Sequence, residues 1–253
     1  MSGGGIVVHE LMFPIIFMVA LAYSAVGHGG ASGYLAVLAL FGFAPSQMAS
    51  SALVLNLLVS GTAFVAFWRS GFFKPKLFWP FAFASIPAAF VGGLIQIPAP
   101  LYGSLLFMAL IFAAIRLLLS KQSVAGGDDD TVPPNYLTIP IGLIIGLVSG
   151  IVGVGGGIFL SPLFILMGWA DSKRTAAVSA AFIWVNSAAG LFGHLHRQGL
   201  NLAELWPLTL AAFLGGLLGS RLGSQRLHHL TLRRILAGVL GVAAYKSFLL
   251  VIR

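Results

Sequence analysis

Cysteine is absent from this chain, and charged residues are scarce, at 8% of 253 positions. Without cysteine the chain has no disulfide framework and no thiol chemistry. A soluble domain carries about 25% charged residues, whereas here 58% of the residues are hydrophobic. Such a chain cannot cover itself with a polar surface in water, so the composition predicts a small all-α polytopic membrane protein.

Two further absences narrow the functional class. No GxxxxGK[ST] string is present, so the chain lacks the phosphate-binding loop of ATP-driven proteins. Residues 1–10 lack the basic region of a cleavable signal peptide, so the first apolar run is expected to stay in the membrane. The net charge of +8 does not indicate nucleic-acid binding. Most Lys and Arg flank apolar runs, where they contact lipid head groups and set orientation.

Glycine, in contrast, is abundant, with 32 residues. The cluster AVGHGG at 25–30 returns as IVGVGG at 151–156. The echo continues in the same order, with small gaps: Gly42 with Gly168, Asn56 with Asn186, Arg69 with Arg197, Trp79-Pro80 with Trp206-Pro207, and Gly92-Gly93 with Gly215-Gly216. This many matches in one order indicate two copies of one unit.

Each copy opens with a long apolar stretch that glycines interrupt. Residues 11–43 as one helix would measure roughly 50 Å, more than the bilayer core of about 30 Å requires. The sequence therefore predicts a broken element followed by three membrane helices. The expected parts are a first repeat at 11–120, a polar linker at 121–135 and a second repeat at 136–251. The apolar segments lie at 47–68, 77–97 and 101–119, then at 174–195, 203–220 and 231–251.

The basic residues predict that the two repeats are inverted. In the first half Arg69, Lys74 and Lys76 lie between the second and third segments, where the second half has only Arg197. The following loop has no basic residue in the first half, but Arg221 and Arg226 lie there in the second. The positive-inside rule then places equivalent loops on opposite faces. Inversion requires an odd number of crossings, so each broken element is expected to be a hairpin or re-entrant segment. Four plain helices per half is the alternative.

The glycine clusters are the candidate substrate site. Each glycine destabilises a continuous helix by about 1 kcal/mol, and a half-helix that starts after such a break presents free N–H groups and partial positive charge to an anion. Close packing between membrane helices is the alternative explanation for small residues. The expected substrate-binding residues are Gly27, His28, Gly29, Gly30, Ser32, Asn56, Gly153, Gly155, Gly156, Gly157 and Asn186.

The polar members of this set have two possible roles each. Asn56 and Asn186 lie within apolar segments, where an amide needs a partner; each could bind a substrate oxygen or hold a neighbouring broken helix. His28 could couple anion movement to protons because imidazole titrates near neutral pH. It could equally be a neutral packing residue, and Val154 stands at the matching position.

The paired GxGG clusters, the SPL string at 161–163 and the Trp-Pro and Gly-Gly echoes resemble the sulfite exporter TauE/SafE family of membrane transporters. The resemblance covers about 11–251, and VGVGGGIFLSPLFILMG is its most specific part. It implies transport of a small anion, a sulfur oxyanion or organosulfonate, across the bacterial cytoplasmic membrane. No cofactor and no catalysis are expected; the expected partners are the anion and membrane lipids, and a homodimer is an open alternative. The first half departs from the pattern at Ala31 and Ala36, where the second has Gly157 and Pro162.

Three rival classes follow from other features. A passive channel for anions or neutral solutes is the strongest, because broken helices also line pores. Gly30–Gly33 match the GxSG string of intramembrane serine proteases, with His194 as a conceivable base, but the position that matches Ser32 is Ile158. A scaffold would leave the glycine breaks unexplained. No metal site is expected, because the pair His194 and His196 lacks a third ligand.

Overall fold

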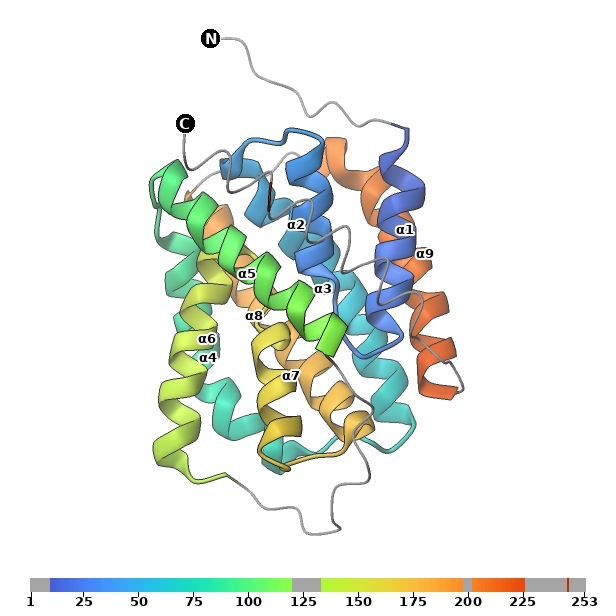
Figure 1. The fold of residues 1–253 in the computed structure, drawn as a ribbon, viewed down its shortest axis with the longest axis vertical. Helices are drawn as coiled ribbons and strands as arrows, with labels where there is room; N and C mark the ends of the chain where they lie inside the picture. The colour runs from blue at the N-terminus through green and yellow to red at the C-terminus, as the bar shows by residue number, and fades with distance from the viewer. Residues whose placement is uncertain (1–9, 120–132, 198–201, 226–244, 246–253) are drawn as a thin grey trace.

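The computed structural model describes residues 10–119, 133–197, 202–225 and 245 (Figure 1). Within these ranges the chain forms helices and contains no strand. The helices are α1 (Met12–Ser24), α2 (Ala31–Leu40), α3 (Pro45–Arg69), α4 (Pro75–Leu94), α5 (Ala99–Leu119), α6 (Asn135–Val152), α7 (Gly157–Leu166), α8 (Ser172–Arg197) and α9 (Leu202–Gln225). Five of them, α3, α4, α6, α8 and α9, are long and apolar enough to cross a bilayer. The all-α polytopic prediction is confirmed.

Some of the predicted parts lie outside the described residues. These are the linker up to residue 132 and the last apolar segment, 231–251, apart from Tyr245. The repeat boundaries therefore stay predictions.

Both long apolar stretches are broken at their glycines, as predicted. The first break separates α1 from α2, and there Gly27 and Gly30 have φ of 75° and 92°. The second separates α6 from α7, and there Gly153, Gly155 and Gly156 have φ of 87°, 72° and 82°. A right-handed helix cannot continue through left-handed residues, and a Cβ would add about 1–2 kcal/mol at each. In Figure 1 each pair of helices folds back on itself, α1–α2 from the upper end and α6–α7 from the lower end.

The first helix of each half packs along a long helix of the other half. Thus α6 lies along α4, and α1 lies along α9. Glycines bring the backbones together: a Cβ on Gly142, Gly146 or Gly150 would collide with the carbonyl oxygens of Phe81, Ser85 and Ala89, and Gly215, Gly219 and Gly223 face Phe17, Leu21 and Ala25 in the same way. Each step of four residues is matched by a step of four, so both pairs are parallel. This exchange interlocks the two halves.

Helices α3 and α8 form the centre of the molecule. Leu53 contacts Gly190, Asn56 bonds Ser187, and Gly61 faces Trp184. Residue numbers rise along α3 as they fall along α8, so these two helices, which correspond between the halves, are antiparallel. Helix α5 crosses obliquely in front of them and contacts α2, α3 and α6 (Figure 1).

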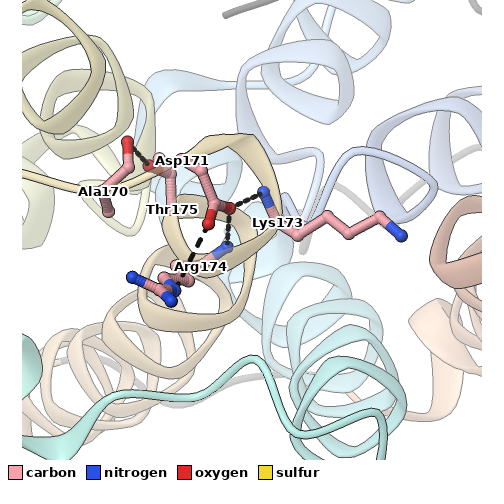
Figure 2. Close-up of polar contacts among 5 residues, drawn as sticks. All are labelled: Ala170, Asp171, Lys173, Arg174 and Thr175. Atoms are coloured by element: carbon pink, nitrogen blue, oxygen red, sulfur yellow. Dashed lines mark hydrogen bonds and ion pairs between the residues drawn. The ribbon is translucent and has the colours of Figure 1, made fainter. Parts of the chain in front are cut away.

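The start of α8 is fixed by Asp171, the residue that precedes the first residue of this helix (Figure 2). Its Oδ1 accepts the backbone N–H groups of Lys173 and Arg174 at 2.8 and 2.9 Å, and its Oδ2 lies 3.3 Å from the Arg174 guanidinium. The Lys173 side chain points away from this cluster and places its ammonium 4.9 Å from the ring of Phe72 in the α3–α4 connection. The α3–α4 connection and the α7–α8 connection therefore lie together at one end of the bundle.

Candidate functional site: the paired helix breaks

The two helix breaks meet on either side of one side chain, Asn56 of α3. A Cβ on Gly29 would collide with Asn56 Oδ1, and a Cβ on Gly155 would collide with Asn56 Nδ2. The same two Cβ positions would each lie 3.0 Å from Ile183 Cγ2 of α8. Gly29 of the first break and Gly155 of the second therefore face the same two side chains at the crossing of α3 and α8.

Asn56 holds this crossing together through both ends of its amide. Its Oδ1 accepts the N–H of Ala31, the first residue of α2, at 3.1 Å. Its Nδ2 donates to Ser187 Oγ of α8 at 2.8 Å. The first N–H groups of a helix have no partner within that helix, so Asn56 satisfies one of those of α2. Of the two roles expected from sequence, the structure shows the one that holds a broken helix.

The position related to Asn56 in the second half is Ile183, not Asn186. Gly27 lies against Ala176 and Gly153 against Ala49, and these paired contacts set the correspondence between α3 and α8. The matching of Asn56 with Asn186 from sequence is therefore displaced by about one helical turn.

Asn186 is buried in α8 and bonds its own helix. Its Nδ2 donates to Phe182 O at 2.8 Å, and its Oδ1 is buried without a hydrogen-bond partner in the described part of the chain. Asn56 is thus bonded to the start of α2, whereas the bond of Asn186 stays within α8.

The start of α7 differs from the start of α2 in one bond: Asn56 of α3 accepts the first N–H of α2, and among the described residues no side chain does the same for α7. The N–H groups of residues 154–158 have no hydrogen-bond acceptor among the described residues. All five residues are buried, and the hydrocarbon branch of Ile183 covers Gly157 where Asn56 caps α2 in the other half. Buried N–H groups are rarely left unpaired in proteins. The second break therefore presents a compact set of donors.

His28 connects the first break to the second half. Its Nδ1 lies 3.0 Å from Val26 O, which only accepts, so Nδ1 carries a proton. Its Nε2 lies 2.9 Å from Ser161 Oγ of α7, and Ser161 is also 2.8 Å from Ser179 Oγ of α8. Sequence comparison missed this link, because Ser161 is not at the repeat position that matches His28.

The Ser32 and His194 pair of the protease alternative is not assembled. Ser32 Oγ lies 2.9 Å from Tyr23 OH within the first hairpin. His194 Nε2 lies 2.8 Å from Gly150 O, and its Nδ1 lies 3.3 Å from Arg197 Nη2. Within the described residues, no group of three His, Cys, Asp or Glu side chains is arranged to hold a metal ion.

Comparison with known proteins identifies the family. Residues 12–247 match the family model of the sulfite exporter TauE/SafE. The chain belongs to this family. It is also 38% identical over 179 residues to the "Probable membrane transporter protein y4hK" of Sinorhizobium fredii (strain NBRC 101917 / NGR234), which covers 70% of this chain and 72% of that protein. No solved structure matches the chain.

The protein is therefore a multi-pass membrane transporter of the TauE/SafE type. At the two helix breaks, glycines let helices pack closely. At the second break, backbone N–H groups are also left without an acceptor among the described residues. Sequence reasoning found the glycines and Asn56. It did not identify Ile183 and Ser187 of α8, which belong to no motif, or the bond of Ser161 to His28.

Proposed function

We propose that this TauE/SafE protein moves a small anion, of the sulfur-oxyanion or organosulfonate class, across the cytoplasmic membrane. The observation that carries the proposal is the run of unpaired N–H groups at 154–158. These donors lie at the N-terminus of α7, where the helix dipole adds partial positive charge. A buried unpaired donor costs about 1–3 kcal/mol, and the several oxygens of an oxyanion would satisfy more than one of them.

The site proposed on this basis lies between the two breaks, which differ in that Asn56 accepts the Ala31 N–H of the first. Gly153, Gly155, Gly156 and Gly157 supply backbone donors, because a Cβ at these positions would fill the space that the anion needs. Gly27, Gly29, Gly30 and Asn56 form the opposite wall, and His28 and Ser32, which bond Ser161 and Tyr23, hold this wall from behind. Asn186 is not part of the proposal because the bond that its side chain makes is to its own helix.

A matched pair of glycine variants tests the site. Gly155 and Gly168 have φ of 72° and 68°, so alanine adds the same left-handed strain, about 1–2 kcal/mol, at both. A Cβ on Gly155 would collide with Asn56, whereas a Cβ on Gly168 meets nothing within 4 Å. We expect Gly155→Ala to abolish sulfite and sulfate flux in proteoliposomes while Gly168→Ala retains it. Normal flux in Gly155→Ala would remove the second break from the site.

The transport mechanism proposed is alternating access between inverted repeats. The antiparallel packing of α3 and α8 supports inversion, as do the two hairpins that fold in from opposite ends (Figure 1). Two equivalent contacts close the site, one toward each end: Gly153 on Ala49 near the start of α3, and Gly27 on Ala176 near the start of α8. Because the halves correspond, each contact can open while its counterpart stays closed.

Replacing the alanine of either contact by leucine should hold that contact, or gate, open. The reporter is a cysteine in place of Ser187 (Ser187→Cys). Ser187 is fully buried beside Asn56 and Gly155, and the chain has no native cysteine. With Ala49→Leu we expect a membrane-impermeant thiol reagent to label Ser187→Cys from the Arg197 end only. With Ala176→Leu we expect labelling from the opposite end only. Labelling from the same end in both variants would contradict alternating access.

Export needs no coupled ion under this proposal. An anion that leaves a negative interior gains about 2.3 kcal/mol per charge at 100 mV. Flux should saturate with substrate and accelerate when substrate is present on the far side. The passive channel, which remains the alternative, would show linear flux without either property.

A further inference from the structure

A cavity of about 250 Å³ lies immediately beyond the Ala49–Gly153 contact. The start of α3, the α4–α5 connection, the start of α5 and the ends of α6 and α8 surround it. Its polar lining comes from Gln96, Tyr102, His194 and Arg197. Ala49 belongs both to the cavity wall and to the contact that closes the second break, so the cavity and the α7 N-terminus lie on two sides of one gate.

Arg197 gives this cavity a fixed positive charge. Its Nη1 donates to Ile95 O at 2.8 Å, and its Nη2 lies 3.3 Å from His194 Nδ1. His194 Nε2 faces Gly150 O, a carbonyl that only accepts, so Nε2 carries the proton and Nδ1 accepts from Arg197. His194 is thus the neutral tautomer, and Arg197 is held over the cavity with further N–H groups, of the five that a guanidinium has, beyond the two bonds that anchor it.

The carbonyl end of α6, which would repel an anion, is covered on the cavity side. Gly150 O accepts from His194, and Val152 O accepts from Tyr102 OH at 3.2 Å. Partial negative charge collects at the C-terminus of a helix, and these two side chains satisfy the carbonyls of Gly150 and Val152. The Arg197 guanidinium is the charged group of the cavity lining.

The positive-inside rule does not explain why Arg197 lies at its end of the bundle. Among the described side chains the other Lys and Arg lie at the opposite end of the bundle, in or beside the α3–α4 connection, the start of α8 and the end of α9: Arg69, Lys74, Lys76, Lys173, Arg174 and Arg221. A basic residue at the non-cytoplasmic end opposes the usual bias. Its side chain is held over a cavity by two hydrogen bonds and does not extend toward lipid head groups. This position indicates that it binds a ligand.

We infer that this cavity is a second anion site, a vestibule in which Arg197 binds the transported oxyanion outside the Ala49–Gly153 gate. The inference rests on the proposed function for the identity of the anion, but the site stands on its own residues. Arg197 binds by charge and by the donors of its planar guanidinium, and lysine would keep the charge without that geometry.

Protection of a cysteine in the cavity tests the vestibule. Gln96→Cys and, as a second reporter, Ala99→Cys are placed in the purified, reconstituted protein and labelled with a thiol reagent from the Arg197 end. Sulfate is the probe, and chloride holds the ionic strength constant. We expect sulfate to slow labelling, and Arg197→Gln to raise the sulfate concentration for half-protection at least about 10-fold, equivalent to about 1.4 kcal/mol. Arg197→Lys should lie between the two, and Arg221→Gln at the other end should match the parent.

Three further readouts separate the possible outcomes. Gly155→Ala should lose transport but keep protection by sulfate; loss of protection in this variant would mean that the reporter senses the helix break, and the vestibule would be wrong. Unchanged protection in Arg197→Gln, with normal elution and thermal stability, would also overturn it. Glu204 lies in the first turn of α9, and loss of protection in Glu204→Gln equal to that in Arg197→Gln would assign the effect to an ion pair. Normal transport in Gly155→Ala would overturn the proposed function and leave the vestibule standing.

Discussion

Replacing Ile183 by asparagine should create in the second half the cap that the first half already has. In the first half the amide of Asn56 accepts the Ala31 N–H at the start of α2. Ile183 occupies the related position, where its side chain covers Gly157 at the start of α7. An asparagine there has a carbonyl oxygen within reach of N–H groups that are otherwise unpaired. We expect Ile183→Asn to occupy the proposed anion site from within the protein.

The magnitude follows from the energy of an N-cap. A capping side chain stabilises a helix by about 0.5–2 kcal/mol. An anion that has to displace the new amide loses that amount, which weakens its Kd about 2-fold to 30-fold at about 1.4 kcal/mol per factor of ten. The free protein should gain thermal stability from the same bond. Stability and affinity thus change in opposite directions, which simple damage to the fold cannot produce.

Two measurements on purified protein check this prediction. Thermal unfolding without anion reports the cap, and titration calorimetry with sulfate and sulfite reports the affinity. Ile183→Leu is the control, because it keeps the volume and polarity of the side chain and adds no hydrogen-bonding group; it should bind like the parent. If Ile183→Asn raises the unfolding temperature and binds both anions with unchanged Kd, then the α7 N-terminus is not the anion site.

Two other predictions concern orientation and local stability. Ser70→Cys should label from the cytoplasm and Gln198→Cys from the opposite face; labelling of both from one face would rule out inverted repeats. Asp171→Ala removes a side chain that accepts two N–H groups at the start of α8, so the free energy of unfolding should fall by about 0.5–2 kcal/mol. Anion affinity should stay unchanged in this variant because Asp171 lies at the end of the bundle, and a large loss of affinity would contradict the central position of the site.

Much of the fold was accessible from sequence because its signals are local. Glycine clusters at 27–30 and 153–157 interrupt helices by backbone conformation alone, and the structure places left-handed residues at both. Asp171 is recognisable as an N-cap because its partners lie two and three residues away. Neither conclusion requires knowledge of which helices touch.

The candidate site was accessible only in part, because its partners come from the other half. The repeat pattern aligned Asn56 with Asn186, yet the packing relates Asn56 to Ile183. A gap of a few residues in a helix rotates a side chain to another face, and identical residue letters cannot reveal that shift. His28 looked isolated for a similar reason, since Val154 matches it in the repeat while its partner, Ser161, lies elsewhere in α7.

The sequence by itself determined that the chain lies in a membrane and where its helices are interrupted. Low charge and long apolar runs require a membrane, and glycine within those runs interrupts the helix whatever surrounds it. Only the tertiary structure decided what the breaks face. The exchange of α1 and α6 between the halves brings both breaks to Asn56 and Ile183, where Asn56 accepts one N–H of the first helix start and Ile183 offers the second no acceptor. In the sequence, Arg197 is a charged residue in a loop between two apolar segments. In the structure, α8 packs against the α4–α5 connection, and Arg197 lines a cavity there. Only folding brings together side chains that are this far apart in the chain.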